Sequence, residues 1–446
     1  MLVCLYFYIA IANVLEEFME NSFNITEVAK GISVCNYKTN RFKTGRISFN
    51  ITVPLGENAS AYAILPYILS RSCGKYMDFS KLNARLAELY GAALIPSVSK
   101  IGEAQIVRLA MTMIDDRFAL ENESIYQQCA QLLCDLVFEP NFENGLFNEV
   151  EVNREKRLLL ERIESQKNDK RVYALLRCEE IMCENEAYGI NYYGNADDVK
   201  ALTPKSIFDA WQEMLKKGII QINVVGNANT DEISNLIKEQ FDKIKRDEIN
   251  RIETKVIKTA NEVKKINEQL PISQGKLVMG YRAGITGQEE NFGAVRVMAD
   301  IFGGAPYSKL FTNVREKMSL CYYCSARLNR QKGIIMVQSG IEQENEQKAI
   351  DEINNQLKLL QDGEFSQDEL SASVAGLKDT LLRVLDTPED IDAWGYSQIM
   401  SKKFQSPQDI IKEIENIDRQ QVIDAAKNVT LDTVYMLSGE EGEDNE

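Results

Sequence analysis

Residues 46–69 read RISFNITVPLGENASAYAILPYIL, and the spacing of the apolar side chains changes within this stretch. From Arg46 to Val53 every second residue is apolar, which is typical of a β-strand with one buried face. From Ala61 to Leu69 almost every residue is apolar, and the frequent alanine and leucine favour a buried α-helix. Pro66 lies in the middle of this helix and lacks a backbone N–H, so we expect it to kink the helix or to begin it.

Helical and strand patterns continue to alternate along the first half of the chain. Ser80–Leu89 keeps a helical phase until Tyr90-Gly91 breaks it, and two strands are predicted next, at Ala92–Lys100 and Gln105–Ile114. The remaining predicted elements of this half are helices at 120–137, at about 144–164 and from Thr203-Pro204, and a buried strand at Ile219–Val225.

The same order of elements returns in the second half. The predicted elements are a strand at Lys276–Tyr281, a helix at Asn291–Phe302, a helix from Ser308, and paired strands at Cys321–Leu328 and Gly333–Gly340. The tripeptide Ser-Lys-Leu opens a helix at Ser80 and again at Ser308, each time before two strands. The matching order indicates an internal duplication. We therefore predict an α+β fold of two homologous duplicated domains, each a mostly antiparallel sheet covered by helices.

Composition sets the expected boundaries of these domains. Residues 1–22 start with an apolar run shorter than the ~20 residues that cross a bilayer, and we assign them as an uncertain leader. A true start at Met19, a non-native leader or a signal peptide are the alternatives for this segment. The other expected parts are an N-terminal domain at 23–245, a linker rich in Lys, Glu and Asn at 246–270, a C-terminal domain at 271–438 and an acidic tail at 439–446.

None of the 446 residues is a histidine, although a chain of this length would ordinarily contain on the order of ten. Histidine is the commonest general base and the commonest metal ligand, so every catalytic dyad or triad that needs an imidazole is excluded. A Ser–Lys catalytic pair needs no histidine and is left as an open alternative. The formal charge of −16 argues against a nucleic-acid partner, because a phosphate backbone would be repelled.

Nine cysteines are spread over the whole chain, an odd number that suits a reduced cytoplasmic protein better than a disulfide framework. Cys321 and Cys324 read C-x-x-C, but they lie in a predicted strand. Residues three apart on a strand point to opposite faces, so we expect no shared site from this pair.

Short motifs in a fixed order give the chain its resemblance to a known family. They are Leu89-Tyr90-Gly91-Ala92, Arg154-Glu155-Lys156, Tyr188-Gly189 with Gly194 and Leu202-Thr203, Val314-Arg315-Glu316-Lys317, and Leu320-Cys321-Tyr322-Tyr323. Through them residues 23–438 resemble the pitrilysin/insulinase family of zinc peptidases, whose duplicated α+β domains form the halves of a clam shell. The chain is similar to the subgroup without catalytic residues that is paired with an active paralogue in Gram-positive bacteria, including a member associated with elongation factor P modification.

Active members of this family carry H-x-x-E-H, which supplies two zinc ligands and a general base, on the helix that corresponds to 61–71. Here these residues read AYAILPYILSR, and the resemblance implies a degenerate metal site at Pro66, Tyr67, Leu69 and Ser70. The family's distal glutamate ligand corresponds to Arg162, whose guanidinium repels a divalent cation. We expect no cofactor in this chain, with zinc only in a partner subunit, and no independent hydrolase activity.

A second family motif is retained, an arginine at a helix end and a tyrosine at the start of the next strand, here Arg315 and Tyr322. In active relatives such a pair donates to substrate carbonyls and to the oxyanion, and neither role needs histidine. Tyr323 is the alternative if the strand register shifts by one residue. The alternative is that the pair has no function. Arg315 would then be a solvated arginine at a helix end, and Tyr322 an ordinary strand tyrosine.

The resemblance implies the non-catalytic subunit of a heterodimeric zinc peptidase in the cytoplasm. Its expected partners are an active H-x-x-E-H paralogue and a peptide substrate, with no nucleic acid and no membrane. The alternative is a peptide- or protein-binding scaffold in a modification or processing pathway. In relatives the edge strand that corresponds to Ala92–Lys100 binds extended peptide, although Pro96 removes one backbone donor from it.

Overall fold

The computed structural model of the chain describes residues 22–246, 248–401 and 404–439. The expected leader and acidic tail, apart from Ser22 and Gly439, lie outside these residues. The chain divides into two compact units. Unit 1 contains the described residues up to Leu160 together with Tyr192–Ile252 and Arg383–Ile399, and unit 2 contains Glu161–Asn191, Glu253–Leu382 and the described residues from Met400 onward.

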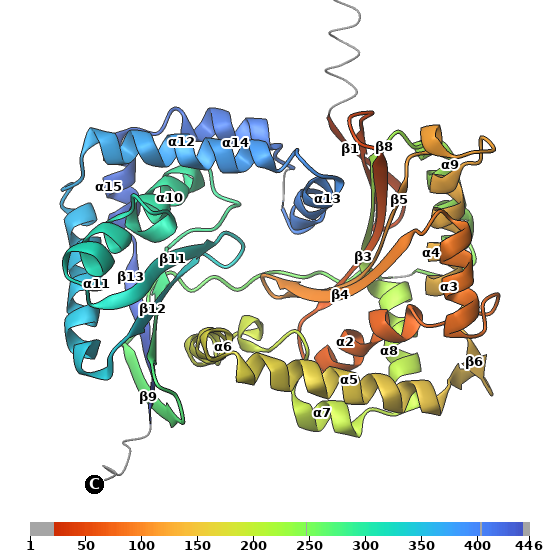
Figure 1. Cartoon of the computed structure of the whole chain (residues 1–446), viewed down its shortest axis with the longest axis horizontal. Helices are drawn as coiled ribbons and strands as arrows, with labels where there is room; N and C mark the ends of the chain where they lie inside the picture. The colour runs from red at the N-terminus through yellow and green to blue at the C-terminus, as the bar shows by residue number, and fades with distance from the viewer. Residues whose placement is uncertain (1–21, 247, 402–403, 440–446) are drawn as a thin grey trace, which may run out of the picture. The chain divides into compact units, whose positions relative to one another are not determined.

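Unit 1 is built on a six-stranded sheet in the order β1-β2-β8-β3-β5-β4 (Figure 1). Only the β2–β8 pair is parallel; the other neighbours are antiparallel. The strands are β1 Phe23–Ala29, β2 Ile32–Lys38, β3 Thr44–Pro54, β4 Ala93–Ile101, β5 Ala104–Ile114 and β8 Ile219–Gly226. A separate small hairpin pairs β6 Phe142–Glu143 with β7 Leu146–Phe147.

The helices of unit 1 include those that the sequence predicts and three more, at 196–201, 230–241 and 388–397, that it does not. They are α2 Ala59–Leu69, α3 Phe79–Glu88, α4 Ile125–Phe138, α5 Glu149–Asn168, which continues into unit 2, α7 Ala196–Ala201, α8 Pro204–Lys217, α9 Thr230–Phe241 and α13 Pro388–Ser397. Thr203 caps α8 as expected, because its side chain accepts a hydrogen bond from the backbone N–H of Ser206. The helix α2 does not begin at Pro66 but continues through it to Leu69.

The expected single buried face of the strand at 46–53 is wrong, because β3 is buried on both faces from Gly45 to Val53. Its apolar side packs toward α4, where Phe49 meets the edge of Phe138 at a ring distance of 6.3 Å. Its polar side carries Arg46, Ser48 and Asn50 and is covered by α13, which lies more than 330 residues later in the chain. A local period of two cannot reveal a cover of this kind.

Unit 2 is built on a five-stranded sheet in the order β11-β12-β10-β13-β9, with only β13–β9 parallel. The strands are β9 Lys264–Leu270, β10 Gly275–Arg282, β11 Cys321–Asn329, β12 Ile334–Ile341 and β13 Thr430–Gly439. The expected linker at 246–270 is therefore too long, since its last seven residues form β9. Their regular alternation of half-buried and exposed residues is the strand signal that the dense charges concealed.

The two sheets share one topology. The strands β5-β3-β8-β2 follow one another in unit 1 as β12-β10-β13-β9 do in unit 2, with β4 and β11 at the corresponding edges. The single parallel pair falls at the same place in both orders. The matching topology supports the internal duplication that the order of elements predicts.

The helices of unit 2 differ more from prediction than its strands do. They are α6 Lys170–Met182, α10 Phe292–Ala299, α11 Glu346–Gln361, α12 Gln367–Arg383, α14 Pro407–Ile414 and α15 Arg419–Lys427, with π-helical segments at Asp300–Gly304 and Leu310–Lys317. The helix expected at 291–302 is thus α10 followed by a π-helical segment.

Short 3₁₀ turns occur in both units, at Asp116–Phe118, Ala187–Gly189 and Gln343–Asn345. Among the described helices, none is both long and apolar enough to cross a membrane.

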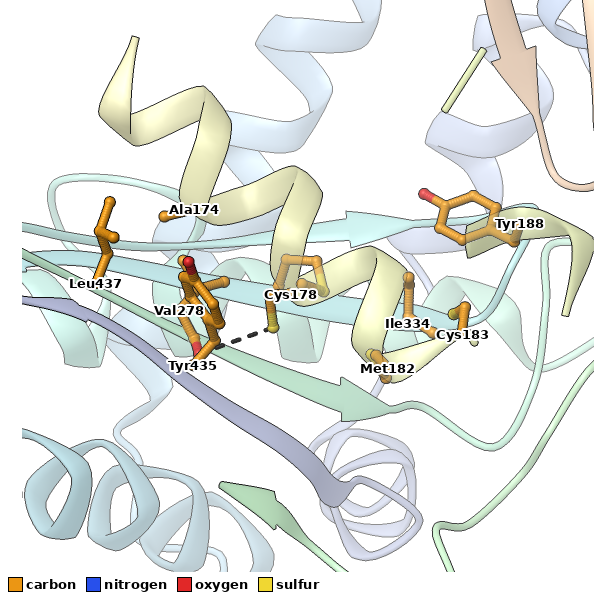
Figure 2. Packing of buried hydrophobic residues seen from close by; sticks show 10 residues of the cluster. Ala174, Cys178, Met182, Cys183, Tyr188, Val278, Ile334, Tyr435 and Leu437 are labelled. Carbon is orange, nitrogen blue, oxygen red and sulfur yellow. Dashed lines mark hydrogen bonds between the residues drawn. The ribbon is translucent and has the colours of Figure 1, made fainter. Parts of the chain in front are cut away.

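Each unit receives one helix from the other half of the sequence. The helix α13 covers β3 and β8 of unit 1, whereas α6 covers β10 and β13 of unit 2. Figure 2 shows the apolar contact beneath α6, where the Cys178 thiol donates to the carbonyl of Val278 at 3.9 Å. The expected boundaries at 245 and 271 do not include this exchange of helices.

Candidate functional site

The positions of the degenerate metal site lie on and just after α2, in unit 1. Pro66, Tyr67 and Leu69 are buried and belong to an apolar helix whose side chains fill the core. Ser70 is half-buried, and its hydroxyl donates to the carbonyl of Tyr67 at 2.9 Å. These four residues offer neither an imidazole nor a carboxylate to a cation.

Arg71 directly follows these positions and pairs with α5. Its Nε lies 3.4 Å from Oε1 of Glu155 and 3.6 Å from Oε2 of Glu151, and its guanidinium carbon lies 4.5 Å from the centre of the Phe79 ring. The Glu155 side chain is only 3% exposed, and a buried carboxylate needs a positive partner. An arginine side chain supplies that charge here.

The role of Arg71 was missed by the sequence analysis, although one signal could have revealed it. Glu151 and Glu155 are four residues apart, so on a helix their carboxylates share one face. Two carboxylates on a helix face that packs against a buried helix need a positively charged partner. Arg71 is the first cationic residue after α2.

A cavity of about 360 Å³ opens beside Arg71. Phe79, Asn141 and Glu151 contribute to its lining, and the apolar side chains of Met77 and Val150 at its rim are well exposed. Its lining contains no pair of groups arranged for nucleophilic or general-base chemistry.

A zinc ion of the family's type does not fit this chain. Arg162, which corresponds to the distal ligand, lies seven residues after Glu155 on α5, or about two turns, and is a half-buried cation. Within the described residues, no three His, Cys, Asp or Glu side chains come together as a metal site would require. These positions therefore supply no ligand set for a catalytic zinc ion.

The retained pair lies in unit 2, with Arg315 on the π-helical segment Leu310–Lys317. The guanidinium carbon of Arg315 lies 4.5 Å from the centre of the Phe311 ring, and its Nη1 lies 3.3 Å from Oε1 of Glu316. The side chain is 38% exposed. Stacking and the ion pair hold the guanidinium in place while leaving part of it open to solvent.

Tyr322 occupies a β-bulge in β11. Cys321 pairs with Ile341 of β12, and Tyr323 pairs with Gly340, so Tyr322 is an extra residue without a partner opposite it. Tyr322 is 61% exposed and its hydroxyl donates to Oε1 of Glu342 at 2.7 Å. The hydrogen bond to this carboxylate raises the pKa of Tyr322, so the phenol stays protonated at neutral pH.

Tyr323 is placed differently from its neighbour. It is half-buried, its ring centre lies 4.4 Å from the guanidinium carbon of Arg171, and its ring lies against Gly340. A Cβ at position 340 would come within 2.5 Å of the Tyr323 ring, so a larger residue there would displace this ring. Among the described residues no hydrogen bond or ring contact joins Arg315 to Tyr322, and each is held by its own neighbours.

The bulge also overturns the expectation that Cys321 and Cys324 point to opposite faces. Cys321 lies opposite Ile341 and Cys324 lies opposite Ser339, two residues apart on the regular strand β12. Their side chains therefore share the face of Ile341 and Ser339. One extra residue between the two cysteines reverses the parity that the sequence predicts.

Comparisons with known proteins agree with a peptidase fold without peptidase residues. Residues 201–377 match the family model described as the peptidase M16 inactive domain. The chain is 31% identical over 413 residues to "Probable inactive metalloprotease YmfF" of Bacillus subtilis (strain 168), with 92% of this chain and 97% of that protein covered. It is 22% identical over 293 residues to "Uncharacterized zinc protease YmxG" of the same organism, with 65% and 70% covered.

Solved structures share the fold over nearly the whole chain. A conserved protein from Enterococcus faecalis V583 has a TM-score of 0.87 and 26% identity, with 95% of this chain and 100% of that chain covered. A peptidase M16 inactive domain from Pseudomonas fluorescens has a TM-score of 0.75 at 14% identity, with 94% and 98% covered, and shows the fold alone. The chain belongs to the pitrilysin/insulinase (M16) peptidase family and is a non-catalytic member of it.

Proposed function

We propose that this chain is the non-catalytic subunit of a heterodimeric zinc peptidase. In this proposal Arg315 and Tyr322 bind peptide next to the active site of a zinc-bearing paralogue. The observation that supports it most is the contrast between the positions that correspond to the family's metal site and the retained Arg315 and Tyr322. The metal-site positions on α2 are filled by apolar side chains, whereas Arg315 and Tyr322 keep exposed donors in a fixed local setting.

The chemistry that the pair would contribute is hydrogen-bond donation. The Arg315 guanidinium would donate to carbonyl oxygens of the peptide, and the Tyr322 hydroxyl to the oxyanion of the tetrahedral intermediate. Tyr322 would have to release Glu342 for this. This hydrogen bond is exposed to solvent and therefore weak, so a developing oxyanion can replace it.

The required partner is a paralogue that carries H-x-x-E-H. Bacillus subtilis contains both a relative named as an inactive metalloprotease and a relative named as a zinc protease, which supports a pairing within one genome. We place the pair in the cytoplasm, a proposal supported by the absence of disulfides among the eight described cysteines.

The test is co-expression of this chain with the H-x-x-E-H paralogue of its own genome, purified through a tag on this chain. We expect a heterodimer that contains one zinc ion and hydrolyses peptides, with neither chain active alone. Tyr322→Phe should lower kcat of the complex by about 10²–10³-fold, the usual effect of removing one oxyanion donor. Arg315→Ala should also reduce turnover without preventing association.

Arg327→Ala is the matched control, since Arg327 is an exposed arginine on the same strand as Tyr322. It should leave kcat and KM unchanged. Full turnover in both Arg315→Ala and Tyr322→Phe would refute the role assigned to the pair, and failure to form a heterodimer would refute the subunit assignment.

A peptide-binding scaffold is the second candidate, favoured by the edge strand β4. This strand ends the sheet of unit 1, so its outer backbone groups have no partner among the described strands, and Ile95 on it is 40% exposed. Peptide binding by the isolated chain, measured by fluorescence anisotropy, together with no effect on the activity of the paralogue, would favour the scaffold over the subunit.

A further inference from the structure

The cysteines Cys321 and Cys324 form a pair of thiols on the inner face of β11. The bulge at Tyr322 places both side chains on the face that carries Ser339 and Ile341, and this face is covered by the two π-helical segments and by α10. Cys324 is 4% exposed, whereas Cys321 is half-buried. The other six described cysteines are all buried, so Cys321 is the accessible thiol of the described chain.

The surroundings of Cys321 favour its thiolate. A hydrogen bond from the Cys324 thiol lowers the pKa of Cys321 most strongly; burial raises it, and Ser339 of β12 and the nearby positive charge of Arg315 lower it further, to about 7. The same contact with Cys321, together with burial, raises the pKa of Cys324 well above its ordinary value. One thiol is thus reactive and its neighbour is kept protonated.

We propose that Cys321 and Cys324 are a reversible dithiol–disulfide pair that exchanges with low-molecular-weight disulfides, with Cys321 as the attacking thiol and Cys324 as the resolving thiol. The proposal rests on the shared face, the contact between the two sulfurs and the difference in their exposure. An attacking thiol is most effective when its pKa lies near the ambient pH, as here.

The exchange proceeds in two balanced steps. The Cys321 thiolate attacks one sulfur of the disulfide, the S–S bond breaks, and the leaving thiolate takes up a proton, which leaves a mixed disulfide on Cys321. Cys324 then loses its proton and attacks Sγ of Cys321, and the second small thiolate leaves and is protonated. The small disulfide is reduced to two thiols while the cysteine pair is oxidised.

Oxidation would act directly on Tyr322, because this residue lies between the two cysteines. A disulfide restricts the distance between the two Cα atoms. Tyr322 lies between them in the chain, so its backbone must adjust to that distance. The inference does not depend on the proposed peptidase partnership, since it concerns the isolated chain. If the partnership also holds, the bridge would alter the setting of the exposed Tyr322 hydroxyl.

The test uses the full chain, reduced and then incubated with oxidised glutathione at neutral pH, followed by peptide mapping with mass spectrometry. We expect a Cys321–Cys324 disulfide in the wild type and a stable glutathione adduct on Cys321 in Cys324→Ser. Cys321→Ser should give neither product. Cys129→Ser, which changes a fully buried cysteine elsewhere, should behave as the wild type.

Two outcomes would overturn the proposal. One is a glutathione adduct that persists on Cys321 of the wild type, because it would show that Cys324 does not resolve it. The other is no faster reaction at Cys321 than at the buried cysteines, which would leave the pair as ordinary core residues.

The pH dependence of alkylation by iodoacetamide gives an independent readout. The rate at Cys321 should rise with an inflection near 7 in the folded chain and near the ordinary value of 9.0 in the unfolded chain. Arg315→Ala should move the folded inflection upward, because it removes a positive charge that favours the thiolate. An inflection that stays at the ordinary value in the folded chain would contradict the assignment of Cys321 as the attacking thiol.

Discussion

The sheet faces beneath the exchanged helices α13 and α6 have the same place in the topology but opposite chemistry. In unit 1 the face beneath α13 is polar, with Arg46, Ser48 and Asn50 from β3 and Gln221 and Asn223 from β8, all buried. In unit 2 the face beneath α6 is apolar, with Val278 from β10 and Tyr435 and Leu437 from β13. One architecture therefore accepts either solution for docking a helix from the other half of the sequence.

The polar face of unit 1 is organised by one carboxylate. Oδ2 of Asp392 on α13 accepts from Nε of Arg46 at 2.6 Å and also from Arg108, while Oδ1 accepts from Ser48 at 2.6 Å and from Asn223 at 2.9 Å. Asp392 is 1% exposed. Because each hydrogen bond has a required direction, this contact specifies one position for α13. The stabilisation from an apolar contact depends mainly on the area that it buries.

The apolar face of unit 2 ends in a small ion cluster. Arg282 bonds to Glu186 and to Asp432, each at 2.8 Å, and Lys332 lies 2.7 Å from Glu186. These charges lie at one end of the contact beneath α6 and leave its centre apolar. Unit 1 therefore concentrates its specificity in the helix contact, whereas unit 2 separates packing from ion pairing.

The largest expected effect is at the centre of the polar face. Asp392→Ala leaves the buried Arg46 with only the exposed Glu389 as a counter-charge and removes the carboxylate from the half-buried Arg108. It should lower the free energy of unfolding by about 3–5 kcal/mol. Both tryptophans, Trp211 and Trp394, belong to unit 1, so tryptophan fluorescence in a urea titration follows this unit.

Glu389→Ala is the control, because Glu389 also pairs with Arg46, at 3.3 Å, but is 48% exposed. It should lower the free energy of unfolding by less than about 1 kcal/mol. Equal losses from Asp392→Ala and Glu389→Ala would mean that the carboxylate of Asp392 does not organise the face.

The next effect concerns the ion cluster of unit 2 and depends on pH. Burial raises the pKa of Glu186, but hydrogen bonds from Arg282 and Lys332 outweigh it, so the pKa lies below its ordinary value of 4.5. The stabilisation is therefore complete above about 4.5 and is lost as the pH falls through the lower, folded-state pKa. Glu186→Gln should cost about 1.5–3 kcal/mol at neutral pH and flatten the fall of stability in acid.

Stability across this pH range can be followed by circular dichroism in urea. Glu184→Gln is the matched control, because Glu184 pairs with Lys264 but is 57% exposed. It should leave the acid dependence unchanged. An acid dependence that is as steep in Glu186→Gln as in the wild type would exclude Glu186 as its source.

The smallest effect is expected on the apolar face. Ile334→Val removes one buried methylene beneath α6 and should lower the free energy of unfolding by about 1 kcal/mol, at every pH and salt concentration. Val263→Ala, at a residue that is 44% exposed, should change it by less than about 0.5 kcal/mol. A strong salt dependence of the Ile334→Val effect would contradict an apolar contact.

The sequence by itself determined many elements of the fold and the loss of the family's metal site. Apolar periodicity placed the strands β3, β4, β5, β8, β10, β11 and β12 and the helices α2, α3, α4, α5, α8 and α10, since side-chain direction repeats every two residues in a strand and every 3.6 in a helix. It missed the strands β1, β2, β9 and β13 and most helices of unit 2. The repeated order of elements predicted the duplication that the shared strand topology supports. The absence of histidine and the apolar residues on α2 excluded the family's metal site, because these are facts of composition that folding cannot change.

Only the tertiary structure decided which polar groups meet. The cover of β3 by α13 and the exchange of α6 both join residues far apart in the chain, and no local pattern encodes such partners. The shared face of Cys321 and Cys324 depends on a single bulge, which pairing with β12 reveals and a period of two cannot. A pattern along the chain reports which side of an element is apolar, whereas buried polar chemistry depends on which other element lies against it.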